Sequence, residues 1–331
     1  MSTGKRSFEG LGRIINKTGK TIKKHLMLAS ISFSLSHKIA QHMFQKSKIL
    51  TLAIDDTLIQ KIYSQFMVGS GRFFDTKIYR KIVAYRLISS VLTDGRYAIP
   101  IGCGFLFDKE LLTGNEIVKW KLDFVKEFIL LAKRLFPEKK IRVAADGLFA
   151  SVDFLKWCLD NKIEADLRMH SNRKVEYKGQ LYKLNQIKRM KLGRGWMARS
   201  VRVKWHDLDL NITAEKRIDK HDKQTIVFIV STYKGRPNQH VKAYKRRWPI
   251  EKKYRTAKQL LGLEECFSTE LETQENHVAA VFLAYAITQL EMKLRNHDTP
   301  EDAIRALKHK NVDSLMHRFC RLDQIFCGIS A

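Results

Sequence analysis

The chain has 331 residues, 44% of them hydrophobic, which is enough for a full core and two or three structural units and excludes a disordered tail. Its formal net charge of +27 far exceeds what solubility requires and predicts a polyanionic partner, with nucleic acid as the first expectation. Five widely spaced cysteines without a C-x2-C pair, and the absence of a signal peptide or a bilayer-spanning apolar stretch, favour a reduced cytoplasmic chain with no membrane partner.

The N-terminal region, residues 1–47, has helical patterning. Its segment FEGLGRIINKTGKTIKKHL has the form of two short helices around a turn that contains Gly19, and the second helix carries Lys20, Lys23 and Lys24. Such a pair is either a helix-turn-helix that contacts DNA or an amphipathic surface pair with no nucleic-acid role. We expect a small helical DNA-binding region here, with these three lysines as candidate DNA contacts.

A buried strand is predicted over residues 49–57, ILTLAIDDT, an apolar run that ends in two acids. The carboxyl ends of buried strands are where α/β folds place their chemistry, so Asp55 or Asp56 is a candidate site residue. Adjacent residues of a strand point to opposite sides, so the two acids cannot share one role.

A hairpin and a helix are predicted next. Two β-rich runs cover residues 81–93 and 96–107, and Asp94-Gly95 between them is a strong hairpin signal. Helical periodicity then covers residues 114–136.

The pattern of the first strand recurs over residues 139–147, KKIRVAADG, a short apolar run that ends in Asp146. An Asp before Gly also forms ordinary turns, so Asp146 is either a site residue or a turn former. A helix over 151–161 and a strand over 162–169 follow, and this alternation predicts a βαβ unit. Asp166 within the last strand is expected to be solvent-facing or structural.

Residues 171–222 change character and predict a β-rich basic insertion. Between 171 and 205 there are eleven Lys or Arg and one Glu, with Tyr and Trp interleaved. This mixture suits a clamp on a DNA backbone, or a solvated β-excursion whose aromatic residues pack a small core. A further strand is expected over 224–232.

The segment YKRRWPIEKKYRTAK places Tyr244, Arg247, Glu251 and Lys258 at relative positions 0, 3, 7 and 14. In a continuous helix these side chains fall within an arc of roughly 60°. One carboxylate among cations suits a site where a divalent metal meets a phosphodiester, although a solvated helix face is the alternative. Pro249 predicts either a kink or a helix restart with the proline in its first turn.

These four positions match a Tyr-x2-Arg-x3-Glu-x6-Lys signature, so the chain resembles the cut-and-paste insertion-sequence transposases of bacteria. The resemblance extends over about residues 10–290 and includes Leu-Gly-Leu-Glu at 261–264, after the signature. It implies an α/β fold with a ribonuclease-H-like catalytic core, a β-rich insertion and a small N-terminal helical DNA-binding region.

The resemblance implies an Asp-Asp-Glu triad of Asp55, Asp146 and Glu251. Asp55 is preferred over Asp56 because members of the family show Asp-x-Thr at this point. The triad would hold two Mg²⁺ ions, or Mn²⁺, about 4 Å apart. The implied activity is cleavage of double-stranded DNA at transposon ends and strand transfer into target DNA by a homodimer. The other signature residues are expected to contact DNA phosphates: Tyr244, Arg247 and Lys258.

We therefore expect five segments and a nucleoid-associated protein of the bacterial cytoplasm. They are a helical DNA-binding region (1–47), a first part of the core (48–170), the β-rich insertion (171–222), a second part of the core (223–297) and a helical tail (298–331). A catalytically decayed or regulatory DNA-binding relative is the main alternative. A structure-selective nuclease or an RNA-binding protein on the same fold stays open.

Overall fold

The computed structural model describes residues 18–28, 31–61, 67–75, 78–107, 121–193, 195, 197–218 and 222–308. Three parts of the sequence-based predictions lie outside the described residues: the first helix before Gly19, the start of the 114–136 helix, and the tail beyond residue 308.

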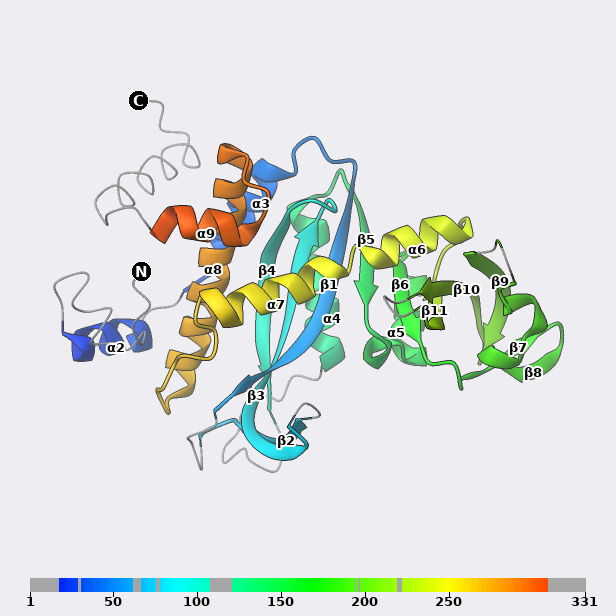
Figure 1. The fold of residues 1–331 in the computed structure, drawn as a ribbon, viewed down its shortest axis with the longest axis horizontal. Helices are drawn as coiled ribbons and strands as arrows, with labels where there is room; N and C mark the ends of the chain where they lie inside the picture. Colours follow the sequence, from blue (N-terminus) through cyan, green and yellow to red (C-terminus); the bar gives the residue numbers. More distant parts are fainter. Residues whose placement is uncertain are drawn as a thin grey trace.

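One mixed sheet runs through the described chain (Figure 1). Strand β1 (Ile49–Gln60) pairs antiparallel with β3 (Arg80–Thr93). The other edge of β3 pairs with β4 (Ala98–Leu106) and with the short strand β2 (Gly71–Asp75), which the sequence patterns did not predict. The Asp-Gly hairpin between β3 and β4 is confirmed, because Asp94 Oδ1 accepts two backbone N–H groups across that turn at 2.8 and 2.9 Å.

The predicted βαβ unit forms the parallel part of the sheet. Strand β5 (Lys140–Ala145) pairs parallel with β1 on one side and with β6 (Glu164–Met169) on the other. A short 3-10 helix, η2 (Gly147–Phe149), and helix α5 (Val152–Asp160) connect β5 to β6. The helix begins at residue 152 because the Ser151 hydroxyl caps it by accepting the N–H of Phe154 at 3.2 Å.

The insertion between β6 and β11 extends the same sheet and consists of two hairpins. These comprise β7 (Lys174–Tyr177), β8 (Gln180–Lys183), β9 (Ala198–Trp205) and β10 (Leu208–Ile218), with two 3-10 turns, η3 (Leu184–Gln186) and η4 (Lys188–Met190). The sheet order continues β6-β11-β10-β9-β7-β8, with β11 (Gln224–Ser231) returning beside β6. Trp205 is buried in the core beneath these strands, so this aromatic residue packs the fold.

Helices cover both faces of the central strands (Figure 1). Helix α4 (Lys121–Leu135) packs on one face, in a core that includes Leu52 and Ile54 of β1. Helix α7 (Trp248–Leu260) packs on the other face, in a core that includes Ala53. Burial on both faces explains why β1 has a nearly continuous apolar sequence. Each buried Leu or Ile contributes about 1.5 to 3 kcal/mol to folding.

The terminal regions meet on the long helix α8 (Leu271–Arg295), which buries Val278, Phe282 and Leu290 in the core. Helix α2 (Gly19–Leu28) is tied to it by Asn276, whose side chain donates to the Leu26 carbonyl at 2.8 Å. The contacts of α8 with two further helices complete this side: α3 (Ser34–Met43) and α9 (Pro300–Lys308). In the described part of the chain, we find no helix with the length and apolarity needed to cross a membrane.

The mixed α/β architecture, with its large and mostly antiparallel sheet, is compatible with the ribonuclease-H-like core that the resemblance implies. Strand, hairpin and helix follow one another as expected, from β1 through β3 and β4 to α4.

Candidate active site

Two acids emerge side by side where the parallel pairing of β1 and β5 ends. The last pair in that ladder is Ile54 with Ala145, and the next residues are Asp55 and Asp146. Neighbouring strands lie about 4.8 Å apart, so the ladder brings the two carboxylates to one place.

The prediction that each strand ends at its acid is right for β5 and wrong for β1. Strand β1 continues to Gln60 because its later residues pair with β3 and Ile59 is buried. Asp146 does precede a turn, the 3-10 helix η2, but its side chain makes no capping hydrogen bond there. The carboxylate of Asp146 is therefore not used to form the turn.

The alternation of β1 separates Asp55 from Asp56. Asp55 shares a face with Ala53, beneath α7, whereas Asp56 shares a face with Ile54, beneath α4. Asp56 accordingly pairs with Arg86 of β3, with Nε to Oδ2 at 2.5 Å. Asp55 is the acid that faces the signature helix.

The signature segment is divided between two helices. Tyr244 lies in α6 (Pro237–Lys245), and α7 begins at Trp248 with Pro249 in its first turn. The expected restart at the proline is confirmed, since proline fits the first turn of a helix and disfavours its interior. The expectation of one continuous helical face is wrong for Tyr244, while Glu251 and Lys258 do share α7.

Arg247, the residue before α7, connects Asp55 with Glu251. Its Nη1 donates to Asp55 Oδ2 at 2.8 Å, and its Nη2 donates to Glu251 Oε1. The guanidinium carbon lies 5.8 Å from the centre of the Tyr244 ring. The structure thus brings Asp55, Glu251 and Tyr244 together around Arg247. In this state Arg247 contacts carboxylates and not the phosphates expected from the sequence.

Burial raises the pKa of Asp55 to about 6, against an ordinary value of 3.8. The positive charge of Arg247 opposes this rise, and the negative charges of Asp56 and Asp146 add to it. Asp146 Oδ1 is buried without a hydrogen-bond partner in the described chain, and Arg168 Nη1 lies 3.9 Å from it. Desolvation is thus the main cause of the raised pKa of Asp55, and Asp146 keeps one oxygen that no described donor uses.

The donor chemistry fits a hard divalent cation, because Mg²⁺ prefers carboxylate oxygens and Asp146 has one unused. As they stand, no three His, Cys, Asp or Glu side chains among the described residues converge closely enough to hold a metal ion. Arg247 occupies the space between Asp55 and Glu251, so joint coordination requires Arg247 to release these carboxylates.

The remaining predicted contacts are placed away from the acids. Lys258 donates to the Leu58 carbonyl at 2.5 Å and pairs with Glu264 at 2.9 Å. On α2, Lys23 pairs with Glu270 at 3.0 Å. Two further lysines of α2 are exposed, Lys20 and Lys24.

A buried hydrogen-bond chain, which the sequence patterns did not reveal, ties α7 to β1. Lys253 Nζ donates to the Ser89 hydroxyl at 2.5 Å, and Ser89 lies 2.6 Å from the Tyr254 hydroxyl, which donates to the Asp55 carbonyl at 2.9 Å. Lys253 is fully buried between the rings of Tyr254 and Phe282. The apolar stripe of α7 could have indicated the burial of Tyr254, but no sequence signal marks Lys253.

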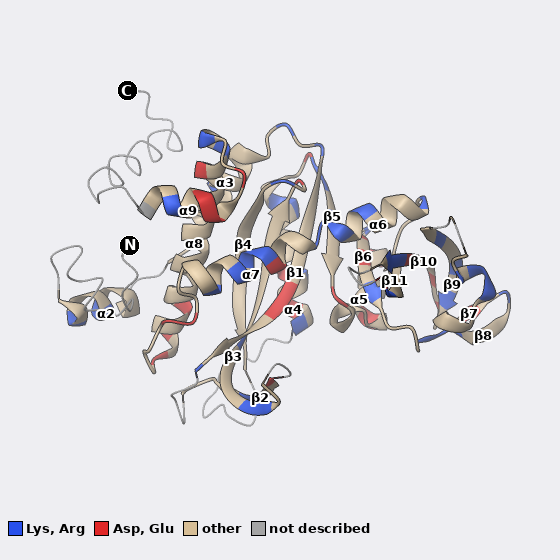
Figure 2. Cartoon of the chain, viewed as in Figure 1, with Lys and Arg blue, Asp and Glu red and all other residues tan. Residues whose placement is uncertain are grey.

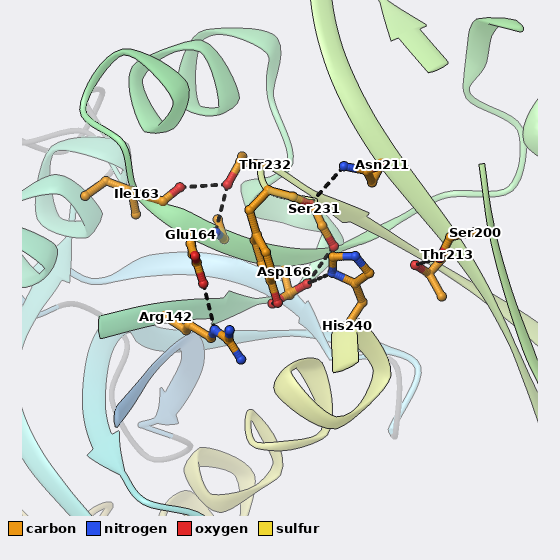
Figure 3. Close-up of polar contacts among 12 residues, drawn as sticks. Arg142, Ile163, Glu164, Asp166, Ser200, Asn211, Thr213, Ser231, Thr232 and His240 are labelled. Carbon is orange, nitrogen blue, oxygen red and sulfur yellow. Dashed lines mark hydrogen bonds and ion pairs between the residues drawn. The ribbon is translucent and has the colours of Figure 1, made fainter. Parts of the chain in front are cut away.

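A second buried network anchors α6 (Figure 3). Asp166 accepts hydrogen bonds from the hydroxyls of Ser231 at 2.6 Å and Tyr233 at 2.8 Å, and its Oδ1 lies 3.1 Å from His240 Nδ1. Asp166 is fully buried and structural, which excludes the solvent-facing alternative. Ser231 and His240 are also fully buried, so this Ser-His-Asp group is not accessible to a substrate. It holds α6, and with it Tyr244 and Arg247, against the sheet.

Comparison with known proteins gave one family match. Residues 123–287 match the family model of the transposase DDE domain. The matched segment contains Asp146 and Glu251, and Asp55 precedes it. A search of curated proteins gave no match. The family match supports a DDE transposase, a class that acts on DNA and generally uses divalent metals.

Proposed function

We propose that this protein is a transposase that cleaves DNA at the ends of an insertion sequence and transfers the freed strands into target DNA. The catalytic carboxylates in this proposal are Asp55, Asp146 and Glu251. The observation that supports it is the meeting of Asp55 and Glu251, from β1 and α7, on the single guanidinium of Arg247. Asp146 belongs with them because it follows β5 at the register position beside Asp55.

The three carboxylates would hold Mg²⁺ or Mn²⁺, and the bound metal supplies activation of the attacking oxygen and stabilisation of the leaving oxygen. Asp55 is largely ionised at pH 7 and above, because its pKa is about 6. Arg247 offers a planar pair of N–H donors that suits a phosphate as well as it suits carboxylates. We propose that Arg247 moves from the carboxylates to phosphate oxygens when DNA enters.

A hollow of about 640 Å³ that Arg247 lines supports a DNA-binding role for the insertion and the signature. Tyr244 and Arg247 line it from the signature, and Lys216 and Arg217 line it from β10. Lys and Arg also recur along α6, α7 and the insertion strands (Figure 2). We propose that Tyr244, Arg247 and Lys258 contact phosphates, with Lys258 exchanging its contact with Glu264.

Two further parts of the proposal follow from the reaction. Transfer of two transposon ends requires that they be held together, so we propose a homodimer acting on the bacterial nucleoid. The exposed Lys20 and Lys24 of α2 are proposed contacts to the transposon end, with Lys23 joining them when it releases Glu270.

Cleavage of a labelled duplex that carries the DNA flanking the gene tests this function. With Mg²⁺ or Mn²⁺ we expect nicks that leave 3′-hydroxyl ends, and with EDTA none. Asp55→Asn, Asp146→Asn and Glu251→Gln should bind the duplex and fail to nick it. The matched control is Asp56→Asn, one residue away on the opposite face of β1, which should retain nicking.

Each contrary outcome has a definite meaning. Retained cleavage in Asp146→Asn or Glu251→Gln would remove that residue from the catalytic set. Loss of cleavage in Asp56→Asn together with retained cleavage in Asp55→Asn would make Asp56, and not Asp55, the first metal ligand. Binding without cleavage by the wild-type protein would favour a regulatory relative, which the presence of all three acids argues against.

A further inference from the structure

A second hollow lies along the outer side of α7. It has a volume of about 620 Å³ and is bounded by the β3–β4 turn, α6, α7, α8 and the start of α9. We call it the α6–α9 groove. Trp248, whose surface is 52% exposed, lines both this groove and the hollow beside Arg247, so it forms the ridge between the two.

The α6–α9 groove is strongly basic. Of its cations, only Lys245 has a carboxylate partner among the described residues, Glu215 at 2.8 Å. Two acids also line the groove, Asp298 and Glu301, and Glu301 already accepts a hydrogen bond from Thr256 at 2.5 Å. The lining cations are Arg96, Lys242, Lys245, Arg246, Lys252 and Arg255.

Helix periodicity places a basic stripe on the outer side of α7, next to Glu251. Trp248, Lys252 and Arg255 recur at intervals of four and three residues along this stripe, and Glu251 lies at its border, where Arg247 pairs with it. Lys252 and Arg255 are exposed, so they are not required for packing. A helix is about 10 to 12 Å across, which equals about three nucleotide steps along a DNA strand.

We propose that the α6–α9 groove binds the phosphate backbone of the DNA strand that leaves the carboxylate site over the Trp248 ridge. This inference rests on the proposed function, because it needs a strand at the acids. Five of the six lining cations have no carboxylate partner in the described part of the chain. A concave groove of this kind suits a narrow polyanion, since each free cation can meet one phosphate and release its counterions. The strand is either the DNA outside the transposon end or the target DNA.

The test compares Lys252→Ala/Arg255→Ala with Lys133→Ala/Arg134→Ala. The control pair removes the same charge from exposed positions in the last turn of α4, on the other face of the sheet. Binding of two fluorescein-labelled duplexes is measured by anisotropy in EDTA over a range of KCl. One duplex carries the transposon end with its outer flank, and the other is a mixed-sequence duplex that serves as target.

Loss of two phosphate contacts should reduce the slope of log K against log [KCl] by about 2. We expect this reduction in the groove variant, and an unchanged slope in the control variant. A reduction confined to the flanked duplex identifies the outer DNA as the ligand, and one confined to the mixed-sequence duplex identifies target DNA. Either result supports the groove.

Unchanged slopes on both duplexes would overturn the groove proposal. Competition by poly-glutamate as effective as that by single-stranded DNA at equal charge would also overturn it, because the groove would then suit an acidic protein. These failures leave the proposed function intact if the wild-type protein still nicks DNA. Failure of the wild-type protein to bind either duplex would instead overturn the proposed function.

Discussion

Replacing Asp55 with Asn should remove a pH-dependent loss of stability that the carboxylate site imposes on the fold. Burial raises the pKa of Asp55 from 3.8 to about 6 in the folded chain. The folded chain therefore retains this proton at pH values where the unfolded chain has lost it. Stability accordingly falls as the pH rises from about 4 to about 6, and remains reduced above pH 6.

The size of the effect follows from the two pKa values. Each tenfold change in proton affinity corresponds to about 1.4 kcal/mol, so ionised Asp55 costs the fold about 3 kcal/mol. Its side chain is only 18% exposed, so solvent screens little of this energy. Part of the loss is already present at pH 4, which leaves about 2 kcal/mol between pH 4 and pH 8.

Urea unfolding in EDTA, followed by circular dichroism at several pH values from 4 to 8, measures this difference. The free energy of unfolding of Asp55→Asn should rise relative to the wild type by about 2 kcal/mol over this range. Asp56→Asn serves as the control, because Asp56 is paired with Arg86 on the opposite face, and it should keep most of the wild-type pH dependence. A constant difference between the wild type and Asp55→Asn across the range would refute the reasoning.

Three further substitutions test the buried networks. Tyr254→Phe should lower stability by about 1 to 3 kcal/mol, because Ser89 and the Asp55 carbonyl lose a hydrogen-bond partner, and an unchanged urea midpoint would contradict these contacts. Burial lowers the pKa of Lys253 well below its ordinary value of 10.5, so wild-type stability should rise as the pH approaches 10.5, because the folded chain releases this proton at a lower pH than the unfolded chain. Lys253→Met should lack this rise, and equal profiles would exclude the effect. Asp166→Ala should cost about 3 to 5 kcal/mol in urea unfolding, because it leaves the buried polar groups around it without their acceptor, and a loss below 1 kcal/mol would contradict that role.

Local patterns predicted most elements of the fold. The Asp-Gly turn, the βαβ unit and the β-rich insertion all follow from residues close in sequence, whose preferences the tertiary structure left unchanged. Strand β2 escaped prediction because it is short and forms only by pairing with the first half of β3. The end of β1 was misplaced because pairing with β3 carries the strand past its two acids.

The site was less predictable than the fold. A strand end marks Asp146 in the sequence, but the choice between Asp55 and Asp56 depends on which helix covers which face of β1. Sequence spacing grouped Arg247 with Glu251 without indicating that the guanidinium also meets Asp55 across the sheet. The burial of Lys253 and Asp166 arises from contacts distant in the chain, and neither residue type predicts it.

The pairing of β6 with β11 has a consequence for how such a chain can change over evolution. These two strands form an antiparallel stem, and the insertion leaves it after Met169 and returns through β11, with β10 paired along the whole length of β11 and β7 and β8 outermost in the sheet. The stem, together with the buried contact between Asp166 and His240, sets where α6 begins. Insertions or deletions beyond the stem can therefore alter the outer strands while the spacing of the acids is preserved. The outer hairpin of β7 and β8 is therefore the part of the insertion whose length and sequence can change without displacing Asp55, Asp146 or Glu251.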